Sequence, residues 1–189
     1  MAKTYNNLGT IAQGRGNYEQ ALDWYQKSLR INEELGIRGE IAISYHHLGR
    51  VAQDHGDYEQ ALDWYKKSLR IEEELGNRAG MAISISQLGV LATERGNPEE
   101  AVPFSLRSLV IRLQIGSPQI RINLHWLNRQ RDLLGEERFG EILREHLSEE
   151  DAVAVLDLMA RFSQEEKDQT DSTTRRSVAD EDSASSNPR

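Results

Sequence analysis

The sequence predicts an all-α protein built from stacked antiparallel helix pairs, and three observations lead to this fold class. First, residues 5–44 align with residues 45–84 without a gap and are identical at 27 of 40 positions. Second, apolar residues recur at three- and four-residue steps, as in Tyr45, Leu48 and Ala52, which indicates helices with one buried stripe. Third, the sequence has no alternating apolar and polar runs and no Asn-Gly hairpin turn, so nothing in it favours strands.

Each repeated unit is predicted to hold two helices joined by a short turn. In the second unit Gly56-Asp57 separates the helices, because glycine suits the left-handed position after a helix and aspartate caps the helix that follows. The second helix then runs from Tyr58 until Gly76 closes it. The third unit uses Asn97-Pro98 instead, a capping residue followed by proline at the first helical position.

The repeat divides the chain into four units. Three are well preserved and span about residues 1–36, 37–76 and 77–116. The fourth, residues 117–147, is degenerate, because its Leu124, Leu127 and Gly135 fit the pattern only after a one-residue deletion.

The third unit departs from the first two inside its second helix. Ser105 stands where those units have Tyr25 and Tyr65, and Pro103 removes one backbone hydrogen-bond donor from the same helix. We therefore expect the third unit to pack less well against the fourth than the first two units pack against their neighbours.

The repeated residues resemble the motif of the tetratricopeptide repeat family. They are Tyr5, Leu8, Gly9, Ala12, Gly16, Ala21, Tyr25 and Ser28, and the same residues recur forty positions later. The family's usual repeat has about 34 residues, so this chain is similar to the long-repeat branch that includes kinesin light chains and bacterial regulatory proteins. The resemblance implies an α-solenoid, a right-handed superhelix of antiparallel helix pairs.

The C-terminal part is expected to contain a capping helix and a tail. Ser148 and Asp151 form a capping-box pattern before an apolar stripe, so residues 148–162 are predicted to form a helix that covers the last unit. The alternative is that its apolar face is a docking surface. Residues 163–189 contain few apolar residues and are predicted to form a disordered acidic and polar tail.

The N-terminal end is expected to lack a cap. Met1 aligns with Ile41, so the first helix begins inside a unit. The chain is then a fragment of a longer array, or its first helix is frayed or covered by a partner. Such an uncapped end offers a surface for self-association.

The sequence contains no recognisable catalytic site, and the chain is predicted not to be an enzyme. It has no cysteine, which excludes disulfides, thiol catalysis and thiolate zinc sites. No two of its five histidines stand four residues apart, and it has neither a GxxxxGK[ST] loop nor a GxSxG turn. We therefore expect no cofactor and no metal ion.

Charge and hydropathy indicate the class of partner. A net charge of −8 disfavours nucleic acid and anionic membranes, which are bound by clustered Lys and Arg. No segment has the roughly 18 consecutive apolar residues of a membrane-spanning helix, and the N-terminus lacks the apolar core of a secretory signal. These features predict a cytoplasmic chain whose partner is another protein or peptide.

The resemblance also implies where a partner binds, namely the concave groove formed by the first helix of each unit. The positions that point into it are Asn6, Thr10, Gln13, His46, Arg50, Gln53, Ser86, Val90 and Thr93, with His125 and Arg129 from the degenerate unit. The set contains no acidic residue, so we expect a partner segment that bears carboxylates, with Arg50 as its main anchor. The alternative is that these are simply exposed helix positions.

The groove residues also disfavour one well-known function of the family. The clamp that binds the C-terminal carboxylates of chaperones needs lysine, asparagine and arginine at its contact positions. This chain has Asn6, Thr10, His47, Ile83 and Gln87 there. A cochaperone that binds chaperone tails is therefore disfavoured.

Two functional classes remain open at the level of sequence. One is an adaptor that binds a partner segment in its groove. The other is a sensor or oligomerisation region, or a fragment, of a larger bacterial signalling ATPase or regulator. The residues of a repeat scaffold do not name its partner, because such folds keep their core while the groove varies.

Overall fold

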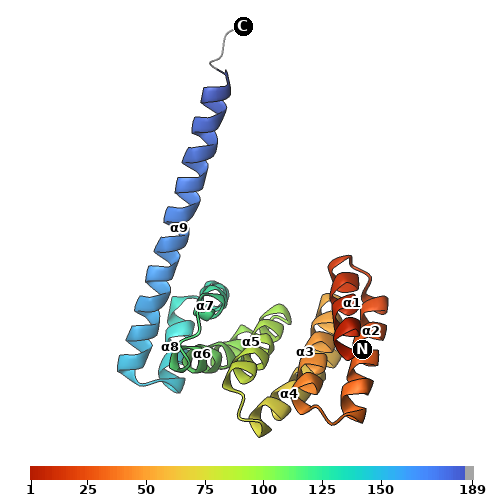
Figure 1. The fold of residues 1–189 in the computed structure, drawn as a ribbon. Coiled ribbons are helices and arrows are strands. Elements are labelled where there is room, and N and C mark those ends of the chain that lie inside the picture. Colours follow the sequence, from red (N-terminus) through yellow and green to blue (C-terminus); the bar gives the residue numbers. More distant parts are fainter. Residues whose placement is uncertain (186–189) are drawn as a thin grey trace. The chain divides into compact units, whose positions relative to one another are not determined.

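The computed structural model describes the backbone of residues 1–185 and the side chains of residues 1–168. Over residues 1–185 the chain forms nine helices and no strand, which confirms the predicted all-α class. The helices are α1 (Ala2–Gly14), α2 (Tyr18–Glu34), α3 (Arg38–Asp54), α4 (Tyr58–Glu74), α5 (Arg78–Glu94), α6 (Pro98–Gln114), α7 (Ile120–Leu134), α8 (Glu136–His146) and α9 (Glu149–Ser185) (Figure 1). By its contacts the chain divides into residues 1–142 and 143–189, and each part is described by itself.

Glycine ends the first six helices at intervals of twenty residues. Gly16, Gly36, Gly56, Gly76, Gly96 and Gly116 all have φ between +63° and +86°, a left-handed conformation that other residues adopt only with strain. At the first of these turns the Gly16 N–H donates to Gln13 O and the Asn17 N–H donates to Ala12 O, which is the Schellman pattern. Asn17 then caps α2 by accepting a hydrogen bond from the Gln20 N–H at 3.3 Å.

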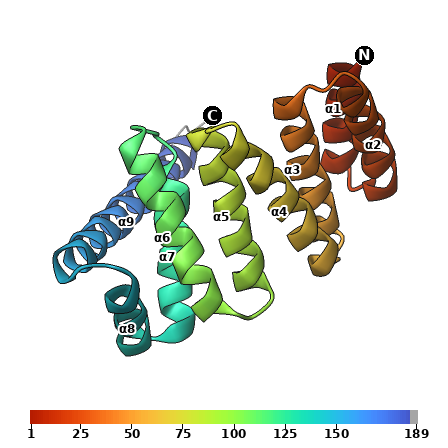
Figure 2. The same cartoon turned by 90° about the horizontal axis from the view of Figure 1, so that it is seen from below.

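The pairs α1/α2, α3/α4 and α5/α6 follow one another along residues 1–142, and α7 packs against α6 (Figures 1 and 2). Within each of the first two pairs a glycine and a tyrosine meet. A Cβ added at Gly9 would lie 2.6 Å from the Tyr25 ring, and one at Gly49 would lie 2.7 Å from the Tyr65 ring. Both rings are fully buried. The glycines therefore allow the two helices to approach, as the motif predicts.

The third pair has a different side chain beside its glycine. Ser105 lies beside Gly89, and the buried Gln130 side chain of α7 reaches it from the next helix. Gln130 Nε2 donates to Ser105 Oγ at 2.9 Å and to Thr93 Oγ1 at 3.0 Å. Gln130 thus bonds to Ser105, which stands at the position of the tyrosines in the first two pairs, and α6 continues as one helix past Pro103. Ser105 was expected to weaken the packing, and the hydrogen bonds of Gln130 compensate for part of this loss.

The second part of the chain contains α9, whose start matches the capping pattern. The Asp151 N–H donates to Ser148 Oγ at 3.1 Å, and the Ser148 hydroxyl donates to the Asp151 carboxylate at 2.7 Å. The predicted role of residues 148–162 as a lid concerns the placement of this part against the first, and it stays a prediction.

The segment after Phe162 differs from the tail expected from composition. The backbone of residues 163–185 continues α9 as a helix, whereas residues 186–189 lie outside the described part of the chain. No glycine or proline interrupts residues 149–185, so no local signal ends the helix there. An ion pair between Asp157 and Arg161, four residues apart, adds a small local stabilisation.

Candidate partner-binding groove

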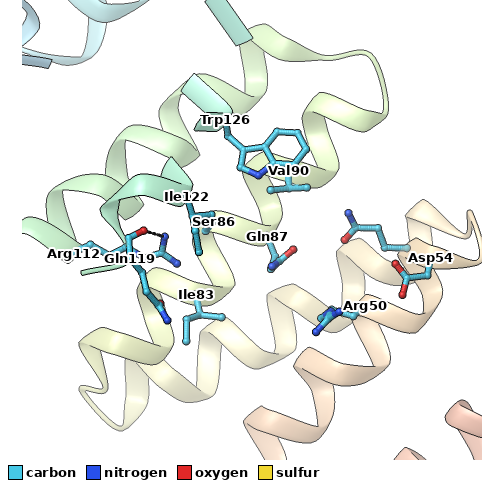
Figure 3. A pocket seen from close by; sticks show the side chains of 11 residues that line it. Arg50, Asp54, Ile83, Ser86, Gln87, Val90, Arg112, Gln119, Ile122 and Trp126 are labelled. Carbon is cyan, nitrogen blue, oxygen red and sulfur yellow. Dashed lines mark hydrogen bonds between the residues drawn. The ribbon is translucent and has the colours of Figure 1, made fainter. Parts of the chain in front are cut away.

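The largest cavity described among residues 1–142 lies where α3, α5 and α7 face a common space. It has a volume of about 410 Å³. Its lining combines charged, amide and apolar side chains: Arg50, Gln53, Asp54, Ile83, Ser86, Gln87, Val90, Arg112, Gln119, Ile122 and Trp126 (Figure 3). All but Arg112 and Gln119 come from the first helices of their pairs, which is where the resemblance locates the groove.

Two guanidinium groups give this groove a positive character. Arg50 is exposed and, among the described residues, makes no hydrogen bond or ion pair. Arg112 is only 4% exposed; its Nη1 donates to Asn123 Oδ1 at 2.6 Å and to the Gln119 backbone oxygen at 3.0 Å. Burial lowers the pKa of the Arg112 guanidinium, but an arginine side chain keeps its proton in proteins, so Arg112 stays charged. Both groups are available to attract an anion.

The one carboxylate that lines the groove is already engaged. Asp54 Oδ2 accepts a hydrogen bond from Gln13 Nε2 at 2.6 Å. Gln53 is held in an equivalent way one unit later, because its Nε2 donates to the Glu94 carboxylate at 2.7 Å and its Oε1 accepts from the Tyr65 hydroxyl at 2.7 Å. These hydrogen bonds hold the Asp54 and Gln53 side chains in place along the groove.

The groove also has an apolar part. Ile122 is 45% exposed and Ile83 is 37% exposed, although both are large apolar side chains. Trp126 is half-buried beside them, with the Arg129 guanidinium 5.3 Å from its ring centroid. A partner that covers these three side chains removes apolar surface from water.

A second cavity of about 270 Å³ continues toward α1. Thr10, Gln13, Tyr25 and His47 line it, and Arg50 and Asp54 border both cavities. The Tyr25 and His47 rings are stacked with their centroids 4.7 Å apart. Arg50 therefore stands between two adjoining cavities.

The two adjacent histidines do not add positive charge near neutral pH. Burial, then the charges of His47 and Arg50, lowers the pKa of His46 from 6.5 to about 4. Burial and the charge of Arg50 lower the pKa of His47 to about 4 as well. The positive character expected of this set thus rests on its arginines.

The residues named from the sequence fall into three groups: those that line a described cavity, one that is buried, and those that line no described cavity. Arg50, Gln53, Ser86 and Val90 line the larger cavity, Thr10 and Gln13 line the second cavity with Arg50, and His46 lines a third one. Thr93 is buried and bonded to Gly89 O and Gln130. No described cavity includes Asn6, His125 or Arg129.

Sequence reasoning missed several lining residues. Ile83 and Gln87 were named only as positions of the chaperone-type clamp, although they precede Val90 at helical steps and so belong to the same stripe. Trp126 adjoins the predicted His125, and the degenerate repeat made that register uncertain by one residue. Arg112 carried no signal, because it lies on a second helix where the equivalent residues are Asn32 and Glu72.

Known protein structures resemble this arrangement. BtubC (BKLC) from P. vanneervenii superposes with a TM-score of 0.69 at 19% identity, over 88% of this chain and 64% of that one. A kinesin light chain from Podosopora anserina with nearly identical TPR-like repeats gives 0.63 at 17% identity, over 91% and 90%. The apo form of RapI gives 0.62 at 14% identity, over 90% and 71%. This chain therefore spans slightly less than two thirds of BtubC, and these likenesses concern the fold.

The comparison of sequences assigns the family. No curated protein sequence matches the chain. No helix among the described residues is long and apolar enough to cross a bilayer. The model of the tetratricopeptide repeat matches residues 1–74 and again residues 40–114. Such repeats generally mediate protein–protein interactions and are typically non-catalytic scaffolds. The chain belongs to the tetratricopeptide repeat family.

Proposed function

We propose that this chain is a protein-interaction module that binds an acidic segment of a partner protein in the groove lined by α3, α5 and α7. The observation that carries the proposal is the unpartnered guanidinium of Arg50 at the junction of two cavities. The chain has a net charge of −8, so a groove whose charges are two arginines and one engaged carboxylate differs from its average surface.

The chemistry of the groove favours a carboxylate close to apolar side chains. A guanidinium can donate two parallel hydrogen bonds to a carboxylate, which adds geometric specificity to the charge attraction. The buried Arg112 contributes positive potential in a region of lower dielectric, where charges interact more strongly than in water. Ile83, Ile122 and Trp126 provide the apolar contacts next to them, and tryptophan is enriched among residues that dominate binding energy.

A peptide array tests the proposal. Short peptides of alternating apolar and acidic residues are compared with the same peptides carrying Lys in place of the acids, and binding of the full chain is measured by fluorescence anisotropy. We expect the acidic set to bind and Arg50→Glu to weaken it about tenfold or more, since losing one partner of a desolvated charge pair costs roughly 2–5 kcal/mol.

Arg70→Glu is the matched control. Arg70 is an exposed arginine of α4 in the same unit and lines none of the described cavities, so the variant makes the same charge change away from the groove. Circular dichroism checks that both variants keep their helices. Equal weakening by the two variants, or a preference for the Lys peptides, would contradict the proposal.

A further inference from the structure

A smaller cavity between α3, α4 and α5 contains a buried carboxylate. Its volume is about 220 Å³, and Ala42, Ile43 and Ile83 give it apolar walls. Glu72 of α4 is 4% exposed, and its Oε2 atom has no hydrogen-bond partner among the described residues. Burial raises the pKa of the Glu72 carboxyl, while a hydrogen bond with the Asn77 side chain opposes the rise. An unpartnered carboxylate oxygen in such a place is costly, so its presence requires an explanation.

The neighbouring backbone leaves room for this carboxylate. A Cβ at Gly80 would overlap the Glu72 carboxylate, so the Glu72 side chain and α5 can pack this closely only because residue 80 is glycine. The cavity also reaches the surface, since Ile43 on its wall is 43% exposed. The cavity thus opens beside α3, and Glu72 is one of the residues that line it.

The other polar groups of the cavity offer acceptors. The Ser68 hydroxyl donates to the Ala42 backbone oxygen at 2.9 Å, so the 3.1 Å bond between the Ser68 and Ser84 hydroxyls must be donated by Ser84. Ser84 Oγ is left with lone pairs only. His46 also lines the cavity, and its Nδ1 has no partner; with the proton on Nε2, this atom is an acceptor too. Three of the residues that line this apolar-walled space thus carry an acceptor atom with no donor bonded to it.

We propose that this cavity is a binding site for a primary alkylammonium group, whose charge pairs with Glu72 and whose methylene chain packs on Ile43 and Ile83. An ammonium has three donors and no acceptor, which complements Glu72, Ser84 and His46. The alkyl part suits the apolar walls, and the pairing removes the cost of a lone buried carboxylate. The site is separate from the proposed acidic-segment groove, although Ile83 borders both.

The residues at the equivalent position of the other units indicate that Glu72 has a role other than helix packing. Glu72 aligns with Asn32 in the first unit and Arg112 in the third. Asn32 is also buried, and its Nδ2 lies 3.5 Å from Ser28 Oγ, so a neutral residue is accommodated at this place in the fold. The carboxylate is therefore not required for helix packing, and Glu72→Asn is a variant with a precedent in the same chain.

Calorimetric titration of the full chain with n-butylammonium and with Nα-acetyl-lysine N-methylamide tests the proposal. The first probe stands for a free amine and the second for a lysine side chain of a partner. We expect saturable binding of at least one probe, weakened about tenfold or more in Glu72→Asn and Glu72→Gln and unchanged in Arg70→Glu, which lies outside the described cavities. Binding of both probes indicates that a partner's lysine can enter, and binding of n-butylammonium alone indicates a free amine.

Two controls keep the result decisive. n-Butanol has the same alkyl chain without the charge, and tetramethylammonium has the charge without donors; neither is expected to bind. Circular dichroism checks that the Glu72 variants stay folded. Absence of saturable binding by both amines, which leaves a cavity that holds water only, would overturn the proposal. Equal binding of n-butanol, or undiminished binding in both folded Glu72 variants, would overturn it as well.

Discussion

The second and third units each have a glycine at the same position of their first helix, Gly49 and Gly89. Different side chains pack beside these two glycines. In the second unit Tyr65 of the same helix pair packs its ring against Gly49. In the third unit the smaller Ser105 lies beside Gly89, and Gln130 of α7 donates a hydrogen bond to its hydroxyl. In the second unit the glycine and the ring belong to the same helix pair, and the ring's hydroxyl donates to Gln53 of that pair. The arrangement in the third unit depends on the next helix and leaves Gln130 Oε1 buried without a partner among the described residues. We therefore expect the two units to differ in stability although their backbones are equivalent.

The largest effect is expected from removing the ring. Tyr65→Ala leaves a cavity beside Gly49 and should lower the free energy of unfolding by roughly 3–5 kcal/mol, the usual cost of deleting a large buried aromatic side chain. Ser105→Ala at the equivalent place loses one hydrogen bond from Gln130 and should cost about 1 kcal/mol. Urea unfolding followed by circular dichroism measures both. Similar costs for the two variants would show that the units do not differ in this way.

The glycines give the next largest effect. Gly49→Ala forces a Cβ to within 2.7 Å of the rigid Tyr65 ring, and we expect a loss of about 1–3 kcal/mol from overpacking. Gly89→Ala meets Ser105 Oγ at 3.0 Å, a smaller side chain, while alanine gains up to about 1 kcal/mol of helix propensity over glycine. The second variant should therefore be clearly less destabilising in the same urea experiment. A greater loss in Gly89→Ala would contradict the comparison.

The last expected effect concerns pH. The pKa values of His46 and His47 are lowered to about 4 in the fold, mainly by burial, whereas both return to 6.5 on unfolding. Between these values the unfolded chain binds more protons, so the histidines' contribution to the free energy of unfolding is complete above pH 6.5 and is lost as the pH falls toward 4. The third unit has Ser86 and Gln87 at these positions.

The double variant His46→Ser, His47→Gln isolates this effect. It gives the second unit the residues of the third, and its thermal unfolding should depend less on pH across that window than that of the unchanged chain. Carboxylates titrate at the low end in both proteins, so the difference between the two profiles is the informative quantity. Parallel profiles would mean that the histidines do not contribute.

The repeat made most of the fold predictable. The helix pairs were marked by glycines at twenty-residue intervals and by the recurring Tyr25 and Tyr65. These residues act locally, at a turn or within one helix pair, and the first two units repeat them at the same positions. Gln130 was not predictable as the substitute for a ring, since its role depends on a side chain crossing from α7 after a one-residue shift in register. The continuation of α9 past residue 162 was missed because composition describes burial and does not specify where a helix ends.

The candidate site was predictable only where it follows the motif. Arg50 and Gln53 were found because motif positions carry over from unit to unit. Arg112 and Glu72 were not, since they occupy a buried position of the second helices whose identity changes from asparagine to glutamate to arginine along the array. A repeat pattern identifies residues that recur, whereas Glu72 and Arg112 differ from the equivalent residues of the other units.

The twenty-residue spacing of the glycine turns has a consequence for how such a chain can change in length. The side-chain bonds that join units span short distances in sequence, such as Gln13 to Asp54 and Gln53 to Glu94, each over 41 residues. An inserted copy of residues 38–77 would therefore find every partner in its immediate neighbours, and folding would need no longer loop to close. An insertion of one residue, by contrast, rotates all later side chains by about 100° around their helix. Duplication in steps of forty residues is the change that this architecture tolerates, and the near-identity of its first two units is the result expected from such a step.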